Sequence, residues 1–301
     1  MTDLTRQGLD PRPSSVQDDA AFQLTAQELA RLRDKAQFIR LETIRLIEIA
    51  KVGHYTSVFS AAELFAALYY DVMDLRHGEP KWPDRDRFMM GKGHAAVGLF
   101  PVLVEWGFFD QSILDNYTRL GNPLGDHPDM RKVPGVDFSS GSIGHALSGG
   151  LGMALAGRML GQSFNTFVML GDGEMQEGQV WEAALGAAHH KVHNLFAIID
   201  RNGFQLDGSV DDVIGIEPLA DKWIAFGWET HVVDGHDLAT LTPLLRRLKA
   251  DTQRTRPVCI IANTVKGKGV SYMETEPGWH LGYLDPEDAQ RAVEEIKSKV
   301  I

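Results

Sequence analysis

Two polar segments with the residue types of a magnesium and phosphate site lie thirty positions apart in the second half of the chain. The first is Gly171-Asp172-Gly173, and the second is Asp200-Arg201-Asn202-Gly203-Phe204. The Asp172 carboxylate, the Asn202 carboxamide and the main-chain carbonyl of Phe204 are hard oxygens, which an octahedral Mg²⁺ takes together with phosphate and water oxygens. Either segment alone reads as an ordinary turn. Their spacing, about one strand-helix-strand crossover, favours a joint metal site.

The elements that must position these residues follow from short apolar runs that alternate with helical patterns. This alternation predicts βαβ units, and therefore an α/β fold with a parallel central sheet and helices on both faces. In such sheets the ligand binds beyond the carboxyl ends of the strands, which brings Asp172 and Asn202 to one edge. The expected strands are 166–170, 195–200, 229–233 and 258–262, and the expected helices lie near 178–190, 218–226 and 237–249.

The first half of the chain is expected to be helical after a polar arm. Residues 1–22 are predicted to be mobile, and a helix should run from Thr25, with Glu28 completing a capping box, to Ala50. A second helix is expected to start near Ser60, with Glu63 completing another capping box. Because no linker interrupts the rest, residues 23–301 are expected to form one domain.

Composition excludes several classes of protein. The 301 residues include 30 basic and 41 acidic side chains, for a formal net charge of -11, which argues against nucleic-acid binding. No run of 18 apolar residues predicts a membrane span, and the first residues lack the plan of a secretory signal, so a cytoplasmic location is expected. The single cysteine, Cys259, excludes a disulfide framework and lies in an apolar run, which favours buried packing.

Longer motifs resemble one enzyme family. GDGEMQEG, followed by DRN, resembles the diphosphate-binding motif of thiamine-diphosphate enzymes, and its QEG ending is typical of transketolase. Further segments fall in the same family order, among them VGHYTSVFSAAELFAALYY, DRFMMGKGHAAVGLFPVL, GDHPDM, SSGSIGHALSGGLGMALA, TVKGKG and PGWH. The resemblance implies the thiamine-diphosphate-binding fold, the cofactors thiamine diphosphate and Mg²⁺, and transfer of a two-carbon ketol unit from a ketose to an aldose.

The same resemblance implies roles for individual residues. Any lone histidine or glycine-rich helix is more often structural, and Glu182 could equally be a solvated helix residue, so these roles depend on the match. It assigns substrate or catalytic contacts to His54, His127 and His280, cofactor contacts to His94, Gly141, Ser142, Ile143, Gly173, Glu177, Asn202 and His280, metal ligation to Asp172, Asn202 and Phe204, and a subunit interface to Glu177 and Glu182.

The match covers only the first half of a full-length transketolase. The second half of the family supplies the glutamate that activates the cofactor, an aromatic cradle for its ring and arginines for sugar phosphates. The chain is therefore expected to be the N-terminal subunit of a split transketolase, inactive without a separate C-terminal subunit of about 310 residues. By family resemblance the assembly would be α₂β₂.

Departures from the family pattern concern the substrate rather than the metal. Tyr55-Thr56 stands where Pro-Gly is usual, Gly144-His145-Ala146 where Gly-Gln-Gly is usual, and Ser142 where proline is common. The hypothesis is a less common ketose that carries a phosphate or similar anionic group, such as a branched or sulfonated sugar. Two alternatives stay open, namely an alpha-type subunit of a 2-oxo acid dehydrogenase and a non-catalytic regulatory or assembly subunit.

Overall fold

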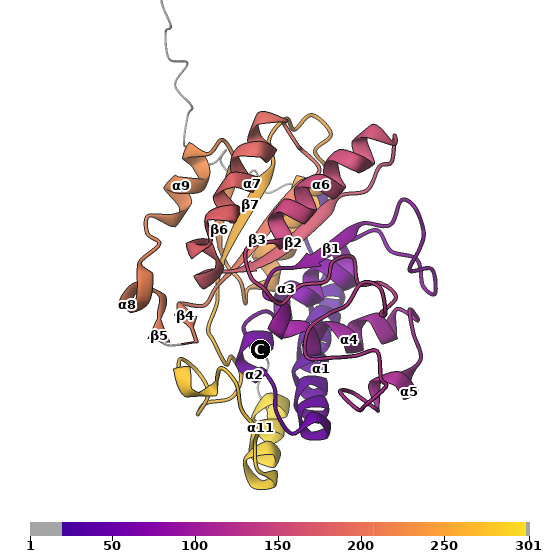
Figure 1. Cartoon of the computed structure of the whole chain (residues 1–301), viewed down its shortest axis with the longest axis vertical. Coiled ribbons are helices and arrows are strands. Elements are labelled where there is room, and N and C mark those ends of the chain that lie inside the picture. The colour runs from indigo at the N-terminus through magenta and orange to yellow at the C-terminus, as the bar shows by residue number, and fades with distance from the viewer. Residues whose placement is uncertain (1–19, 207, 299–301) are drawn as a thin grey trace, which may run out of the picture.

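The computed structural model describes residues 20–206 and 208–298 (Figure 1). Of the arm expected at 1–22, residues 1–19 lie outside the described residues, and Ala20–Phe22 form a short 3₁₀ turn, η1. The described part is built around a five-stranded sheet in the order β1-β2-β3-β7-β6. The strands are β1 (Arg87–Met90), β2 (Thr166–Gly171), β3 (Leu195–Arg201), β6 (Glu229–Asp234) and β7 (Val258–Asn263).

All pairings in this sheet are parallel, which confirms the predicted fold class. The central strands are apolar and buried on both faces, as a parallel sheet covered by helices requires. Successive side chains of β2 point to opposite faces: Phe167 and Met169 join one hydrophobic core, and Val168 and Leu170 join the other. The cysteine in β7, Cys259, is fully buried, as its apolar neighbours predicted.

Helices cover both faces of the sheet (Figure 1). The core on one face contains residues of α1, α3, α4, α10 and α11, and the core on the other face contains residues of α6, α7 and α9. The α-helices are α1 (Ala26–Ala50), α2 (Tyr55–Phe59), α3 (Ala62–Ala67), α4 (Ala96–Glu105), α5 (Gln111–Leu114), α6 (Ala146–Met159), α7 (Gly178–His189), α8 (Val210–Ile214), α9 (Leu219–Ala225), α10 (Leu238–Ala250) and α11 (Pro286–Ser298).

Shorter turns and a hairpin complete the architecture. A π-helical turn, η2 (Leu68–Val72), continues α3, and the 3₁₀ turns are η3 (Gly93–Ala95), η4 (Gly173–Gln176) and η5 (Pro277–Trp279). The strands β4 (Phe204–Gln205) and β5 (Gly208–Ser209) form a small antiparallel pair after β3. No helix within the described ranges is long and apolar enough to cross a bilayer.

The helix expected from Thr25 to Ala50 is confirmed, but the capping box expected at Ser60 is wrong. Thr25 and Glu28 form their reciprocal cap on α1. Helical structure resumes earlier than expected, at Tyr55, and Glu63 turns into the core, where it accepts hydrogen bonds from Arg40 at 2.6 and 2.8 Å. A buried guanidinium needs a counter-charge, so tertiary pairing overrides the local signal.

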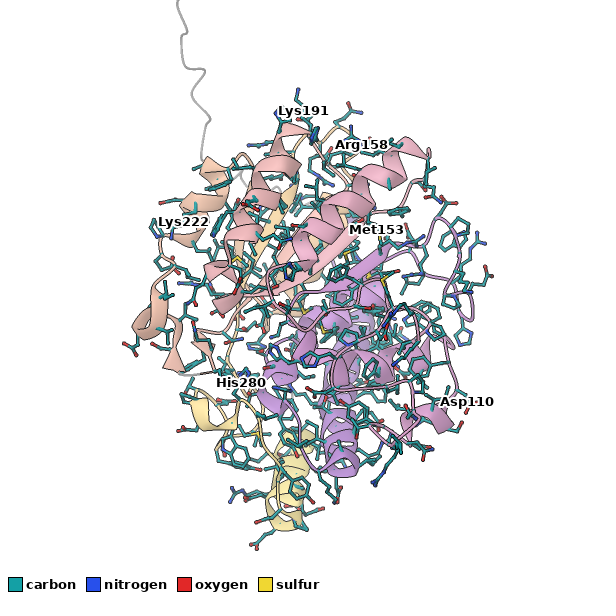
Figure 2. The ribbon with its side chains drawn as sticks, in the orientation of Figure 1. Asp110, Met153, Arg158, Lys191, Lys222 and His280 are labelled. Atoms are coloured by element: carbon teal, nitrogen blue, oxygen red, sulfur yellow. The ribbon has the colours of Figure 1, made fainter. Side chains whose placement is uncertain are left out.

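The strand β1 has no counterpart in the predictions. Its four residues are fewer than the runs that marked the other strands, yet its pairing with β2 extends the sheet. This strand ends just before the GKGH segment and so carries that segment to the carboxyl edge of the sheet. Figure 2 shows His280 far from Arg158 and Lys191, which follow α-helices leading into the amino ends of β2 and β3.

Candidate active site at the carboxyl ends of the strands

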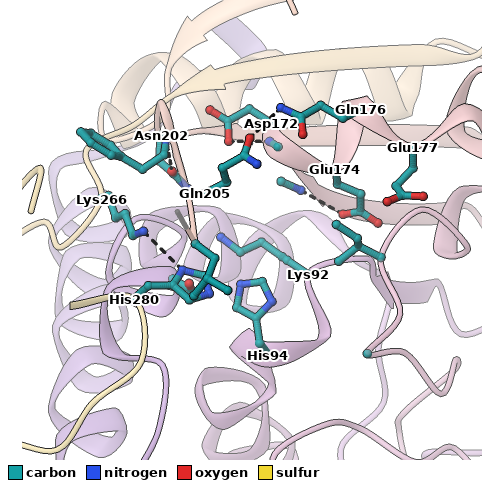
Figure 3. Close-up of a pocket in the computed structure, with 17 residues that line it drawn as sticks. Lys92, His94, Asp172, Glu174, Gln176, Glu177, Asn202, Gln205, Lys266 and His280 are labelled. Carbon is teal, nitrogen blue, oxygen red and sulfur yellow. Dashed lines mark hydrogen bonds between the residues drawn. The ribbon is translucent and has the colours of Figure 1, made fainter. Parts of the chain in front are cut away.

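A cavity of about 420 Å³ lies where β1, β2 and β3 end (Figure 3). In Figure 3, Lys92, His94 and His280 lie on one side of it, facing Asp172 and Asn202. Its lining residues come from segments spread over most of the chain. They are Ser57, Lys92, His94, Gly141, Ile143, Gly171, Asp172, Gly173, Glu174, Gln176, Glu177, Asn202, Phe204, Gln205, Leu206, Lys266 and His280.

Asp172 is the first residue after β2 and is almost completely buried, at 2% exposure. Its Oδ1 accepts a hydrogen bond from the Gly173 N–H at 2.9 Å, and its Oδ2 accepts one from the Gly203 N–H at 2.6 Å. The second bond ties the loop after β2 to the loop after β3. Burial, and then the nearby Asp200 charge, raise the pKa of Asp172 to about 6 despite these main-chain bonds. Such a carboxylate gains from a bound cation.

Asn202 follows β3 and faces the same cavity from the neighbouring strand. Its Oδ1 accepts from the Phe204 N–H at 3.1 Å, and its Nδ2 donates to Asp200 at 3.2 Å. The residues described contain no cluster of three or more His, Cys, Asp or Glu side chains that could hold a metal. Asp172, Asn202 and the Phe204 carbonyl are therefore a partial ligand set, which an octahedral ion would complete with ligand and water oxygens.

Asp200 supports this site from behind, and no sequence pattern had singled it out as a supporting residue. It is fully buried, accepts from Ser60 at 2.7 Å, and pairs with Lys92 and Thr264. Burial opposes its ionisation, but Lys92 and the hydroxyl donors outweigh burial and lower its pKa below the usual value. Asp200 thus stays charged and orients the Asn202 carboxamide.

Two buried lysines give the cavity positive charge although the whole chain is acidic. Lys92 and Lys266 are 2% and 1% exposed, and both line the cavity. Burial, and then repulsion from Lys92, lower the pKa of Lys266 to about 8. Buried ammonium groups are costly without anions, so this wall suits an anionic ligand such as a diphosphate. Neither lysine carries a periodic signal in the sequence, since both lie in loops.

His54, His94 and His280 form a triangle at one end of the cavity. Their ring centroids are 5.0 Å apart for His54 and His94, 5.3 Å for His54 and His280, and 5.2 Å for His94 and His280. Burial, together with Lys92, lowers the pKa of His94 well below its usual range. Burial, and then Lys266, lower the pKa of His280 to about 4. Both imidazoles are neutral at pH 7 and can donate and accept hydrogen bonds.

Three sequence-predicted residues do not line the cavity itself. His54 is packed behind His94 and His280, Ser142 is exposed, and His127 is an exposed side chain beside Gly141. A Cβ atom at Gly141 would lie 3.0 Å from the His127 ring, which shows how closely this ring meets the glycine turn. His127 and His54 therefore stand at the margin of the site.

The turn from Gly141 to Gly144 is clamped by Glu174, a role that the sequence pattern did not reveal. Glu174 accepts from the Gly144 N–H at 2.7 Å and from the Gly171 N–H at 3.1 Å. Gly141 and Gly144 have φ values of 154° and 89°, in the left-handed region that favours glycine. Burial raises the pKa of Glu174 to about 7, although both main-chain bonds oppose the rise.

Comparison with known protein families decides what this arrangement is. The family described as transketolase, thiamine diphosphate binding domain, matches residues 32–298. The chain belongs to the transketolase family.

Similar transketolases include proteins named as subunits. One of the two subunits named for apulose-4-phosphate transketolase, from Phocaeicola vulgatus, is 38% identical over 259 residues, which cover 85% of this chain and 91% of that protein. A 6-deoxy-6-sulfo-D-fructose transketolase subunit of Clostridium sp. is 37% identical over 268 residues, which cover 89% of this chain and 97% of that protein.

Full-length transketolases match over less than half of their own length. The solved structure of transketolase from Leishmania mexicana superimposes with a TM-score of 0.83 at 26% identity, covering 88% of this chain and 41% of that one. Mouse transketolase is 36% identical over 275 residues, 91% of this chain and 43% of its own. The structural match also shows that the central sheet is the thiamine-diphosphate-binding fold.

The positions at which this transketolase chain departs from the family pattern have clear contacts. The Thr56 hydroxyl donates to the main-chain carbonyl of Trp279 at 3.0 Å, next to His280. The Tyr55 hydroxyl accepts from the Leu284 N–H at 3.2 Å. These bonds join the start of α2 to the segment that carries His280. His145 contacts Gln179 on α7, at the surface rather than in the cavity.

Proposed function

We propose that the chain is the cofactor-binding subunit of a two-chain, Mg²⁺-dependent transketolase. The single observation that carries the proposal is the convergence of Asp172 and Asn202 on a cavity that also holds Lys92 and Lys266. Oxygen ligands on one wall and buried cations on the other are the chemistry that a magnesium diphosphate group requires. Family membership and relatives named as transketolase subunits support the same function.

The residues present fit thiamine diphosphate and Mg²⁺. Asp172, Asn202 and the Phe204 carbonyl would hold the metal, and the raised pKa of Asp172 is the mark of a carboxylate without a cationic partner. Lys92 and Lys266 would neutralise the diphosphate. When bound, the cofactor supplies the carbon nucleophile and electron sink that allow a carbon–carbon bond beside a ketose carbonyl to break.

Other residues of the cavity would bind and orient. The neutral imidazoles of His94 and His280 can donate hydrogen bonds to phosphate oxygens without adding fixed charge. Lys266 approaches the Nδ1 of His280 at 3.3 Å, and a protonated lysine makes that nitrogen the acceptor. The proton of neutral His280 then lies on Nε2, and this N–H is free to serve a ligand.

The margin of the cavity is the place for the sugar and for the glycine turn. His54 and His127 would hold substrate hydroxyls. Gly141, Ser142, Ile143 and Gly173 would contact the cofactor through their main chain, with the turn held in place by Glu174. Water exclusion at this margin depends on the second subunit, because several of these groups are exposed.

A separate C-terminal subunit would complete the enzyme. The chain covers most of the relatives named as subunits but only 43% of mouse transketolase. Glu177 and Glu182 are exposed at and beside the cavity mouth, where they would meet another chain in an α₂β₂ assembly. The partner would supply the glutamate that activates the cofactor. A cytoplasmic location agrees with anionic sugar substrates and one buried cysteine.

The substrate is proposed to be a ketose with an anionic end group. Two similar subunits are named for apulose 4-phosphate and for 6-deoxy-6-sulfo-D-fructose, which carry a phosphate and a sulfonate. The departures at Tyr55 and Thr56, which support the His280 segment, agree with a ketose other than the usual pentose phosphates. Turnover of xylulose 5-phosphate and ribose 5-phosphate at ordinary transketolase rates would contradict this substrate proposal.

Co-expression with the product of the neighbouring reading frame tests the function. The purified complex should transfer a two-carbon unit when supplied with Mg²⁺ and thiamine diphosphate, and the isolated chain should be inactive. Asp172→Ala should abolish transfer and cofactor binding measured by calorimetry, whereas Asp34→Ala, a surface control, should change neither. Oxidative decarboxylation of pyruvate by the complex, or full activity of Asp172→Ala, would refute the proposal.

A further inference from the structure

Asp126 places one carboxylate between two histidines at the margin of the cavity. Its Oδ1 lies 3.5 Å from the Nδ1 of His54, and its Oδ2 lies 3.5 Å from the Nδ1 of His127. Both separations are longer than the 2.7–3.2 Å of an ordinary hydrogen bond. The carboxylate therefore lies near both rings and keeps hydrogen-bonding capacity for a third group.

His54 provides a second and independent sign of a missing ligand. It is only 9% exposed, and its Nδ1 is a buried polar atom with no hydrogen-bond partner among the described residues. Leaving such an atom unsatisfied is costly, so a native site normally supplies a partner. A hydroxyl between the two residues could accept from the imidazole N–H and donate to Asp126. A carboxylate or phosphate oxygen has no proton to donate there.

The charge on Asp126 is retained at neutral pH and lacks a close cation. Burial tends to raise its pKa, but the neighbouring His54 and His127 outweigh burial and lower it. Within residues 20–206 and 208–298, its ion-pair contacts are these two histidines, and it has no contact with lysine or arginine. The lysines of the cavity, Lys92 and Lys266, are engaged by Asp200 and His280. Asp126 thus gives this margin negative potential.

We propose that Asp126 is a specificity-determining residue that selects an uncharged, hydroxyl-bearing carbon beside the transferred two-carbon unit and rejects a carboxylate there. The proposal rests on the proposed function and deepens it. The anionic end group of the ketose would then lie away from Asp126, toward the second subunit. The same repulsion disfavours 2-oxo acids, whose carboxylate is bonded directly to the reacting carbonyl carbon.

Two sugar donors that differ in charge at this position test the proposal in the assembled complex. L-Erythrulose and hydroxypyruvate carry the same two-carbon unit, but its neighbour is a hydroxyl-bearing carbon in the first and a carboxylate in the second. Asp126→Asn should raise the ratio of kcat/KM for hydroxypyruvate to kcat/KM for L-erythrulose by about tenfold, which corresponds to about 1.4 kcal/mol of removed repulsion. Asp126→Ser should shift the ratio in the same direction.

Asp129→Asn is the matched control, because it removes the same charge from the same loop. Asp129 pairs with Arg131 and Ser139 rather than with a histidine, so the ratio should change less than about twofold. The ratio compares two substrates in one preparation and is insensitive to the folded fraction. An unchanged ratio in both Asp126 variants would overturn the assignment while ketol transfer itself stands. A wild-type complex that uses no ketose at all would instead overturn the proposed function and this assignment together.

Discussion

Replacing Glu63 by glutamine should remove the counter-charge of a guanidinium that is completely buried. Arg40 and Glu63 are both 0% exposed and share two hydrogen bonds, and Arg40 also donates to the Phe59 carbonyl at 2.7 Å. The second oxygen of Glu63 contacts the Nδ1 of His236 at 2.8 Å. The Nε2 of His236 accepts from the Val265 N–H at 2.9 Å, which assigns the imidazole proton to Nδ1.

The expected loss follows from two routes that agree. Removing one partner of a buried ion pair costs about 3–5 kcal/mol, since the other charge stays buried and unpaired. Burial alone would raise the pKa of Glu63, but Arg40 and His236 lower it from 4.5 to about 2. A lowering of that size corresponds to about 3 kcal/mol of stability, present above pH 4.5 and lost as the pH falls toward 2.

Urea unfolding of the full chain at pH 7 measures this loss. Glu63→Gln should lower the free energy of unfolding by about 3–5 kcal/mol, and the difference from wild type should shrink below pH 4.5. Glu48→Gln, an exposed change on α1, should stay within about 0.5 kcal/mol. The double variant Arg40→Met with Glu63→Met should regain most of the loss. A loss below about 1 kcal/mol for Glu63→Gln would refute the reasoning.

Three further predictions concern the site. Asp172→Asn should stabilise the metal-free chain by about 1–2 kcal/mol above pH 6, because burial raises the pKa of that carboxyl to about 6, and the gain should vanish below pH 4. Mg²⁺ with thiamine diphosphate should no longer stabilise this variant in urea unfolding, and a loss of stability without metal would contradict the prediction. Thr56→Val should lower kcat/KM of the complex about tenfold, because the hydroxyl that holds the Trp279 carbonyl beside His280 is lost, and Thr56→Ser should restore it. Lys266→Met should weaken cofactor binding by about 10–100-fold in calorimetry, as expected for a lost charge-assisted bond, and unchanged affinity would exclude Lys266 from the diphosphate site.

The strands of the second half could be predicted because local sequence alone determines them. The runs at 166–170 and 195–200 are apolar at every buried position, apart from the polar residue at one end of each, and their structural bounds differ from the predicted ones by a single residue. The juxtaposition of Asp172 and Asn202 follows from the same rule, since adjacent parallel strands end at one edge. These inferences need only strand length and order.

The supporting residues could not be predicted because they depend on contacts between distant segments. Lys92 and Asp200 are 108 positions apart, and Glu174 reaches Gly144 across a turn whose position no local pattern determines. Glu63 was misread as a capping residue for the same reason, since its partner Arg40 lies on another helix. Residue type and spacing locate the groups that could contact a ligand. They do not locate the groups that hold those residues in place.

The antiparallel bridge between Gly53 and Gly282 has a consequence for how the protein is made. It joins the His54 segment to the His280 segment, and the nearby bond between Tyr55 and Leu284 spans 229 positions. A ribosome releases the chain from the N-terminus at about 5–20 residues per second. The histidine triangle therefore cannot close until nearly the whole polypeptide has emerged, so coenzyme capture is a late, post-translational event.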